Sequence, residues 1–219
     1  MGKNKLKRWA DVSSLDNVYE YTDFADEGAK KPKGEWSSVF GNTNPIILEL
    51  ACGRGEYTLN LARRHPEKNF IGIDIKGARI WVGANQAKEQ SLENVRYIRM
   101  YIDHIEEYFA EGEIDEIWIT FPDPYLRGTK KHKRLTSARF LDRYRRIMQE
   151  KGLIHLKTDS DPLYEFTIGV LEEEGCDIKR LVKNVYSETP DDPLLTIPTH
   201  YERAHLKVNK TIKYVSFTP

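Results

Sequence analysis

The residue best suited to do chemistry in this sequence is a carboxylate held between two prolines. Asp123 lies in the segment Phe121-Pro122-Asp123-Pro124-Tyr125, which directly follows an apolar run over residues 114–120. Proline fixes its own φ at about −65° and restricts the residue before it, so Asp123 has few backbone conformations open to it. An apolar strand that ends in such a turn predicts a fixed acid at a reaction centre.

A basic segment follows this acid. Residues 127–146 contain nine Lys or Arg and one acid, a local charge of +8, although the chain of 219 residues has a formal net charge of zero. A phosphate backbone responds to the local field, so the loop at the start of the segment is a candidate RNA contact. The loop carries Arg127, Lys130, Lys131, His132, Lys133 and Arg134.

Other charges are also segregated along the chain. Arg139, Arg143 and Arg146 share one face of a predicted helix. Residues 103–116 contain seven acids and no Lys or Arg, and residues 3–8 contain four bases. The alternative for each basic group is a solvated surface with no partner, and the sequence leaves that alternative open.

A second candidate site lies upstream, where an apolar run leads into two glycines. The run over residues 46–50 includes Glu49 and is followed by Gly53 and Gly55, after which residues 56–65 have the pattern of an amphipathic helix. Glycine lets the backbone take positive φ and approach a ligand closely. The pattern predicts a nucleotide-binding turn, although Ala51 stands where the full dinucleotide fingerprint has its first glycine.

Acids follow the next apolar runs at their ends. Asp74 comes 25 residues after Glu49, and Asp103 follows the third run. In doubly wound folds an acid about 20 residues past the glycine turn binds the ribose hydroxyls, which suits Asp74. Asp103 is placed to meet an adenine amino group. Either acid is also suited to cap the helix after it.

The alternation of short apolar strands with helical segments predicts an α/β fold. We expect a doubly wound, mostly parallel sheet of seven strands, with helices on both faces. Glu49, Asp74, Asp103, Asp123 and Asp159 then share the edge where ligands bind. Residues 1–44 are expected to form a polar, partly ordered arm, and residues 45–219 the domain.

Composition narrows the setting. No run of 18 apolar residues is present, which argues against membrane contact. Cys52 and Cys176 have no metal-binding spacing, so neither a metal nor a disulfide framework is expected, and a reducing cytoplasm is the predicted location. Nothing in the sequence indicates an obligatory protein partner.

These features resemble class I S-adenosylmethionine-dependent methyltransferases with a Rossmann-like fold. More closely, they resemble the bacterial tRNA (guanine-N7)-methyltransferases over about residues 45–203. The motifs that carry the resemblance are the Glu-x-x-x-Gly-x-Gly turn, Gly72-Ile73-Asp74, Phe-Pro-Asp-Pro with its basic cluster, Thr158-Asp159, and Thr199-His200-Tyr201-Glu202-Arg203. The sequence departs from the family where it has Ala51, Tyr125 and Arg127 in place of the usual Gly, Trp and Lys.

The resemblance implies a function and a set of site residues. It implies methyl transfer from S-adenosylmethionine to N7 of a guanine in tRNA, namely guanine 46 of the variable loop. It makes Asp123 the catalytic acid and part of the cofactor site, with Glu49, Gly53, Gly55, Asp74 and Asp103. It places Arg127, Asp159, Thr199, Tyr201 and Glu202 against the tRNA substrate.

Three other functions remain open from the sequence. An amino-methyltransferase acting on adenine or cytosine would have a second proline after Pro124, and it would leave the basic loop unexplained. A nicotinamide-dependent dehydrogenase would require a third glycine in the turn. A non-catalytic RNA-binding module would use the basic loop alone and would have no need of Asp74 or the glycine turn.

Overall fold

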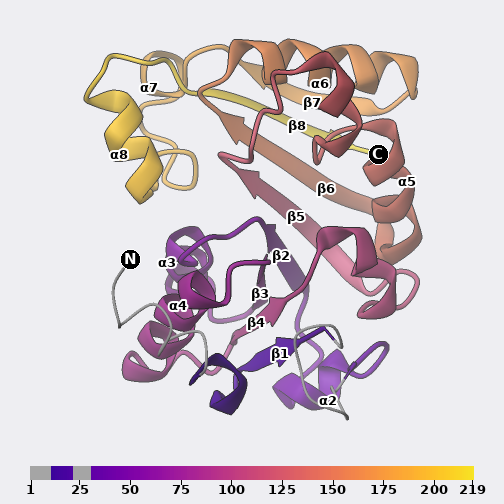
Figure 1. Cartoon of the computed structure of the whole chain (residues 1–219), viewed down its shortest axis with the longest axis vertical. Coiled ribbons are helices and arrows are strands. Elements are labelled where there is room, and N and C mark those ends of the chain that lie inside the picture. Colours follow the sequence, from indigo (N-terminus) through magenta and orange to yellow (C-terminus); the bar gives the residue numbers. More distant parts are fainter. Residues whose placement is uncertain (1–10, 22–30) are drawn as a thin grey trace.

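The computed structural model describes residues 11–21 and 31–219, and within them the chain forms an eight-stranded sheet (Figure 1). The strands are β1 (Val18–Glu20), β2 (Ile46–Leu50), β3 (Asn69–Asp74), β4 (Val95–Arg99), β5 (Ile114–Thr120), β6 (Met148–Thr158), β7 (Asp177–Val182) and β8 (Lys213–Thr218). They are ordered β1-β4-β3-β2-β5-β6-β8-β7. The pairings from β1 to β6 are parallel, whereas β8 runs antiparallel to both of its neighbours.

Helices connect successive parallel strands of the sheet. The α-helices are α2 (Trp36–Phe40), α3 (Glu56–Arg64), α4 (Gly77–Glu89), α5 (Ala138–Ile147), α6 (Asp161–Glu173), α7 (Val185–Glu188) and α8 (His200–Leu206). Short 3₁₀ segments are η1 (Val12–Ser14), η2 (Ile102–Glu107) and η3 (Gly128–Lys133). The doubly wound, largely parallel arrangement predicted from the sequence is confirmed.

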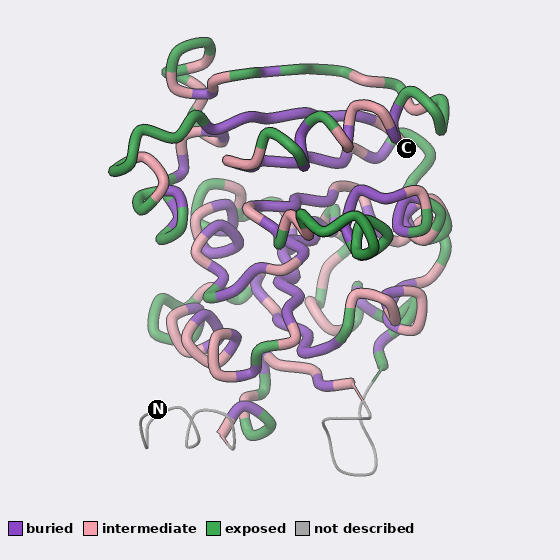
Figure 2. Tube along the Cα trace, turned by 45° about the horizontal axis from the view of Figure 1, so that its top comes forward, coloured by how far each residue is buried: buried purple, intermediate pink, exposed green. Residues whose placement is uncertain are grey.

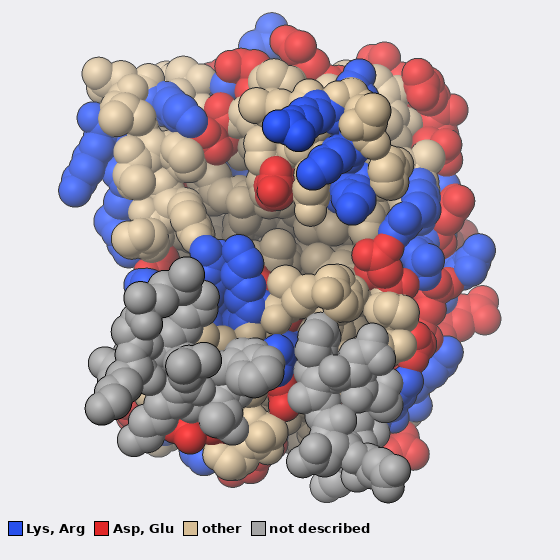
Figure 3. All heavy atoms as spheres, in the orientation of Figure 1, with Lys and Arg blue, Asp and Glu red and all other residues tan. Residues whose placement is uncertain are grey.

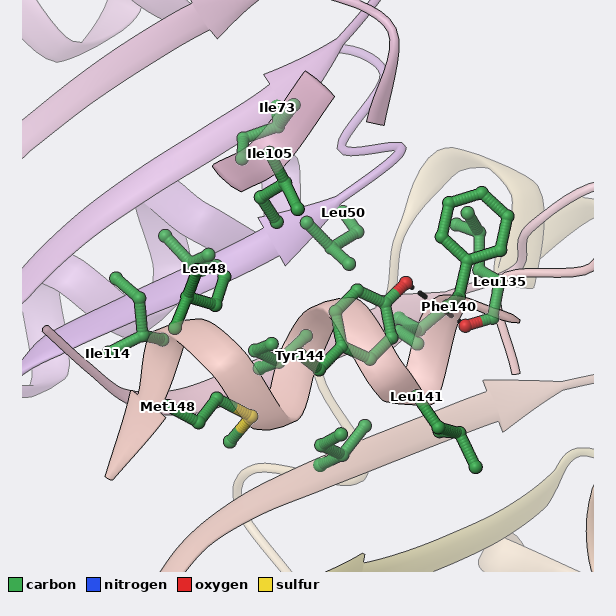
Figure 4. Close-up of a cluster of buried hydrophobic side chains, with 14 of the residues drawn as sticks. Leu48, Leu50, Ile73, Ile105, Ile114, Leu135, Phe140, Leu141, Tyr144 and Met148 are labelled. Carbon is green, nitrogen blue, oxygen red and sulfur yellow. Dashed lines mark hydrogen bonds between the residues drawn. The ribbon is translucent and has the colours of Figure 1, made fainter. Parts of the chain in front are cut away.

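The sheet is buried on both faces, with one apolar cluster on each. In β5, Ile117 and Ile119 belong to the cluster covered by α5 and α6, whereas Trp118 between them belongs to the cluster covered by α3 and α4. Figure 4 shows the first cluster, where Tyr144 packs among aliphatic side chains and its hydroxyl donates to the Leu135 carbonyl at 3.0 Å. The central strands are buried along their length in Figure 2, as expected for parallel strands covered on both sides.

Local signals position the helix after β6. The Ser160 side chain accepts from the Leu163 backbone N–H, and Pro162 lies in the first turn of α6, where a missing N–H costs nothing. Gly175 ends the helix with a φ of +66°, and the following residue donates back to the Leu171 carbonyl. These start and stop signals account for where α6 begins and ends.

The eighth strand is the one that the sequence analysis missed. Strand β1 comes from the predicted arm and pairs with β4 at the sheet edge. Its three residues form no recognisable apolar run, and its Glu20 is buried in an ion pair with Arg99 at 2.7 Å. Trp36, also in the predicted arm, is fully buried and donates through Nε1 to the Tyr108 carbonyl. The N-terminal bases at residues 3–8 lie outside the described residues.

Helix α5, which carries the predicted arginine face, is followed directly by a strand. Helix α5 ends at Ile147, and Met148 already pairs with Ile114 as the first residue of β6. Because Met148 is apolar and follows the helix without a break in the pattern, the sequence alone does not mark this boundary. None of the described helices has both the length and the apolar character of a membrane span.

Candidate active site

A cavity of about 930 Å³ opens at the carboxyl ends of β2, β3, β5 and β6. This is the edge at which parallel α/β sheets bind ligands. Figure 3 shows the hollow in the face of the molecule. Its walls are the β2–α3 turn, the β3–α4 turn, the segment after β5, the start of α6, and α8.

The glycine turn after β2 is a left-handed backbone segment. Ala51, Gly53 and Gly55 have φ of +57°, +59° and +68°. A Cβ on Gly55 would lie 2.2 Å from the Tyr97 hydroxyl oxygen, so this glycine is required by packing beneath the turn. A Cβ on Gly53 would meet no atom within 4 Å, because Gly53 lines the open cavity. Of the two glycines predicted to bind the cofactor, Gly53 lines the cavity, whereas Gly55 does not and packs against Tyr97.

Asp74 locks this turn to the end of β3. Its Oδ2 accepts from the Gly53 backbone N–H at 2.9 Å, and its Oδ1 accepts from the Lys76 backbone N–H at 2.8 Å. The side chain is buried and still lines the cavity. Asp74 therefore orders both loops around the predicted ribose position, in addition to any contact it makes with a ligand.

Glu49 is a buried carboxyl at the base of the cavity. It is 3 % exposed and accepts from the Thr58 backbone N–H at 2.8 Å and from the Thr120 hydroxyl at 2.8 Å. Burial raises the pKa of Glu49 to about 7, although these hydrogen bonds oppose the shift. A raised pKa means that burial disfavours the charged carboxylate. A cationic group in the cavity would stabilise that charged form.

Asp123 sits in a strained turn at the cavity wall. Phe121 and Tyr125, on either side of Pro-Asp-Pro, have φ of +50° and +41°, a region that residues other than glycine rarely adopt. Such strain persists where surrounding contacts hold it, and it clusters at functional sites. Asp123 Oδ1 accepts from the Tyr125 backbone N–H at 3.0 Å. Within the described residues, no donor reaches Oδ2, and the residue is exposed.

Arg134 supports this turn through hydrogen bonds to two of its backbone carbonyls. Its Nε donates to the Pro124 carbonyl at 2.8 Å, and a terminal nitrogen donates to the Tyr125 carbonyl at 3.2 Å. Arg134 is 2 % exposed, and its guanidinium lies over the Phe166 ring. The sequence predicted that Arg134 contacts RNA. In the structure, Arg134 instead supports the Asp123 turn and is too buried to contact a phosphate.

The other two candidate acids for substrate recognition are already paired. Asp159 Oδ2 lies 2.5 Å from Lys210 Nζ and 3.3 Å from His205 Nδ1. Glu202 is fully buried, and its Oε1 lies 2.7 Å from Lys157 Nζ. Of these two acids and Asp123, only Asp123 forms no ion pair within the described part of the chain.

The Lys157–Glu202 pair joins α8 to the sheet. Lys157 Nζ is also 2.9 Å from Glu202 Oε2 and lies 5.8 Å from the centre of the Phe121 ring. The Lys157 carbonyl accepts from the Phe121 backbone N–H at 2.8 Å. Glu202 forms a capping box with Thr199, and its Oε1 accepts from the Tyr186 hydroxyl. Burial lowers the pKa of Lys157, and the Glu202 charge opposes that shift.

Similarity to known proteins agrees with this geometry. A family model described as "Putative methyltransferase" matches residues 43–215. A tRNA (guanine-N(7)-)-methyltransferase of Bacteroides fragilis is 45% identical over 99% of this chain and 86% of its own length. One of Christiangramia forsetii is 44% identical over 98% of this chain and 97% of its own length. This chain belongs to the tRNA (guanine-N7)-methyltransferase family. The resemblance inferred from the motifs is thereby confirmed.

Solved structures support the same fold at lower identity. A 16S rRNA methyltransferase, KamB, matches with a TM-score of 0.64 and 12% identity, covering 85% of this chain and 94% of that chain. A SAM-dependent methyltransferase from Aquifex aeolicus matches with a TM-score of 0.55 and 14% identity, covering 95% and 97%. At these identities the likeness shows the Rossmann-like fold alone.

The cavity of this family member collects seven of the eleven residues predicted for cofactor binding, catalysis and substrate binding. Those that line it are Glu49, Gly53, Asp74, Asp123, Asp159, Thr199 and Tyr201. Gly55, Asp103, Arg127 and Glu202 do not line it. Lys130, Lys131, His132 and Lys133 are exposed on η3 beside it.

The acidic segment after β4 neutralises the basic face of α5. Asp103 forms an ion pair with Arg139, and Glu106 pairs with both Arg143 and Arg146. Asp103 therefore points to α5 in this structure, away from the predicted adenine position. The three arginines have internal partners, which weakens the case for them as an RNA contact.

Several cationic residues that line the cavity were not predicted from the sequence. Arg54, Lys76, Arg79 and Lys210 line it. Lys76 and Arg79 follow the end of β3 closely, so their place after a predicted ligand-binding strand end was the available signal. Lys210 lies in a segment without a motif and is brought to Asp159 only by the fold.

Proposed function

We propose that this protein transfers a methyl group from S-adenosylmethionine to N7 of a guanine in tRNA, and that the guanine is number 46 of the variable loop. The observation that supports the site most directly is the place of Asp123: it is exposed, no donor within the described residues reaches its Oδ2, and it lines the same cavity as the glycine turn. The family to which the chain belongs supports the reaction. Because tRNA is the substrate, we also propose a cytoplasmic location.

The cavity fits a nucleoside cofactor. Its volume of about 930 Å³ lies within the usual range for small-molecule sites, which is roughly 300–1,000 Å³. Gly53 presents backbone without a side chain, and Asp74 and Glu49 place two buried carboxyls beside it. These three residues would hold S-adenosylmethionine. When bound, the cofactor supplies an electrophilic methyl group on a cationic sulfur.

Methyl transfer to guanine N7 needs no general base to expose the nucleophile. Guanine N7 carries a lone pair and no proton, so the main tasks of the protein are to turn the base out of its stack and to align it. The guanine N1–H and N2–H₂ groups form a paired donor edge that a carboxylate can accept. We assign Asp123 to this edge because it forms no ion pair within the described residues, and its negative charge also favours the positive charge that the purine gains.

Nucleoside analysis tests the proposed reaction. Incubation of unmodified tRNA with the protein and isotopically labelled S-adenosylmethionine should give labelled 7-methylguanosine by mass spectrometry. A transcript with adenine at position 46 is the matched control, and it should gain no label. Label in a methylated adenine or cytosine would contradict the reaction, whereas 7-methylguanosine in the control transcript would contradict only the position.

The exposed lysines of η3 should contribute to RNA affinity. Lys130, Lys131 and Lys133 form no ion pair within the described residues, and they stand beside the cavity. Removing the cation that neutralises one phosphate lowers the slope of log affinity against log salt by about 0.7–0.9. Changing all three to Gln should therefore reduce the slope for tRNA by about 2–3. Arg134 is left unchanged because it supports the Asp123 turn.

Salt titrations of tRNA binding measure this effect. The matched control replaces Arg139, Arg146 and Arg180 by Gln, which removes the same charge from three arginines that have carboxylate partners. Its slope should stay near the wild-type value. Equal slopes for wild type and the η3 variant would mean that the η3 lysines form only a solvated surface.

A further inference from the structure

A group of cations lies on the cavity wall opposite η3. Arg54 belongs to the glycine turn, Lys76 precedes α4, and Arg79 lies in the first turn of α4. All three line the cavity. In Figure 3, Lys and Arg side chains gather on both sides of the hollow, over the start of α4 and over the loop after β5.

These cations differ from the arginines of α5 in their partners. Within residues 11–21 and 31–219, none of Arg54, Lys76 and Arg79 forms an ion pair. By contrast, Arg139 and Arg146 each have a carboxylate partner. A paired cation has little charge left for a phosphate, whereas an unpaired cation at a concave surface keeps its field. The free positive charge thus lies at the cavity rather than on α5.

Arg79 also connects this group to the substrate side. Its guanidinium lies 5.7 Å from the centre of the Tyr201 ring, and Tyr201 is 45% exposed at the cavity mouth. An exposed aromatic ring beside cations is the arrangement that proteins use to hold a splayed nucleotide, because the ring stacks on the base and the cation contacts the phosphate.

We propose that Arg54, Lys76 and Arg79 form a second phosphate-binding surface, which holds the RNA strand on the side of the cavity opposite η3. This inference rests on the proposed function. A guanine turned into the cavity remains joined to a phosphate on each side, so the strand must enter and leave across the cavity rim. Cations on both sides of the rim match that path.

The same cations have a second possible ligand, the carboxylate of the cofactor's methionine part. The two roles predict different results for cofactor affinity and for the salt dependence of RNA binding. A cofactor contact changes the affinity for S-adenosylhomocysteine and leaves the salt dependence of RNA binding intact. An RNA contact does the reverse, since each phosphate contact adds its own term to the salt slope.

The test combines both measurements on one variant. In the full chain, Arg54, Lys76 and Arg79 are changed to Gln together. We expect tRNA binding at fixed salt to weaken by about tenfold or more and the salt slope to fall by about 2–3. Affinity for S-adenosylhomocysteine by calorimetry should change less than about twofold. The Arg139, Arg146 and Arg180 variant is the charge-matched control and should keep the wild-type slope.

Other outcomes overturn the inference. A wild-type salt slope in the triple variant overturns the inference. If the slope stays at the wild-type value and the affinity for S-adenosylhomocysteine falls, the three cations bind the cofactor. If the triple variant does not fold, Lys76→Gln alone decides, because Lys76 is exposed; its slope should fall by about 0.7–0.9. The proposed function fails separately, through the absence of 7-methylguanosine from the wild-type reaction.

Discussion

Asp123→Asn should leave the fold and cofactor affinity intact and remove most of the methyl transfer. The turn should survive because Asp123 Oδ1 accepts the Tyr125 N–H, and an asparagine Oδ1 can accept the same bond. The group that changes is Oδ2, which has no donor within the described residues. An amide nitrogen there is a donor facing the donor edge of guanine.

The expected loss is large because two effects add. Leaving a recognition group unpaired costs about 1–3 kcal/mol, and a neutral amide no longer favours the positive charge of the methylated purine. Together they predict a decrease in kcat/KM of at least about 100-fold, since each 1.4 kcal/mol is a factor of about ten. Single-turnover methylation with labelled cofactor measures the rate, and calorimetry measures cofactor affinity.

A neighbouring acid provides the control. Asp161 also lines the cavity, but its carboxylate pairs with Lys213 at 2.7 Å and it opens helix α6. Asp161→Asn should change methyl transfer by only a few fold. Wild-type rates in Asp123→Asn would remove Asp123 from guanine recognition, while equal losses in both variants would indicate a general effect of charge on the cavity.

The sequence predicted the parts of the site that depend on local signals. The glycine turn, Asp74 and Asp123 lie at the ends of apolar runs, and such ends meet at one edge of a parallel sheet whatever the details of packing. The cavity therefore contains these residues, as expected. Motif order also sufficed to identify the family, because each motif keeps its place relative to a strand.

The parts that the sequence did not predict depend on tertiary partners. Arg134 looks like its exposed basic neighbours until the fold buries it against the Asp123 turn. Asp103 looks like a strand-end ligand until α5 brings Arg139 to it. Strand β1 is too short to give a period and is recognised only through its pairing with β4. Charge pairing across distant segments has no signature in one sequence.

Lys157→Met should destabilise the protein strongly and raise KM for tRNA. Lys157 and Glu202 are both fully buried, and their closest approach is 2.7 Å. Removing one partner of a buried pair leaves the other charge uncompensated, which costs about 3–5 kcal/mol. Because Glu202 also caps α8 and Lys157 contacts Phe121, the substitution should loosen α8 and the Asp123 turn together. Denaturant unfolding and steady-state kinetics measure the two effects.

A double variant separates anchoring from direct recognition by Glu202. Lys157→Met with Glu202→Gln removes both charges, while the glutamine can still accept from the Tyr186 hydroxyl. Removing the second charge takes away the cost of leaving Glu202 uncompensated, so the double variant should recover a large part of the free energy of unfolding and of the tRNA affinity that the single variant loses. If Glu202 instead contacts the guanine itself, the double variant should regain stability and remain inactive. Because Glu202 is fully buried and paired with Lys157, we expect recovery of both stability and tRNA affinity.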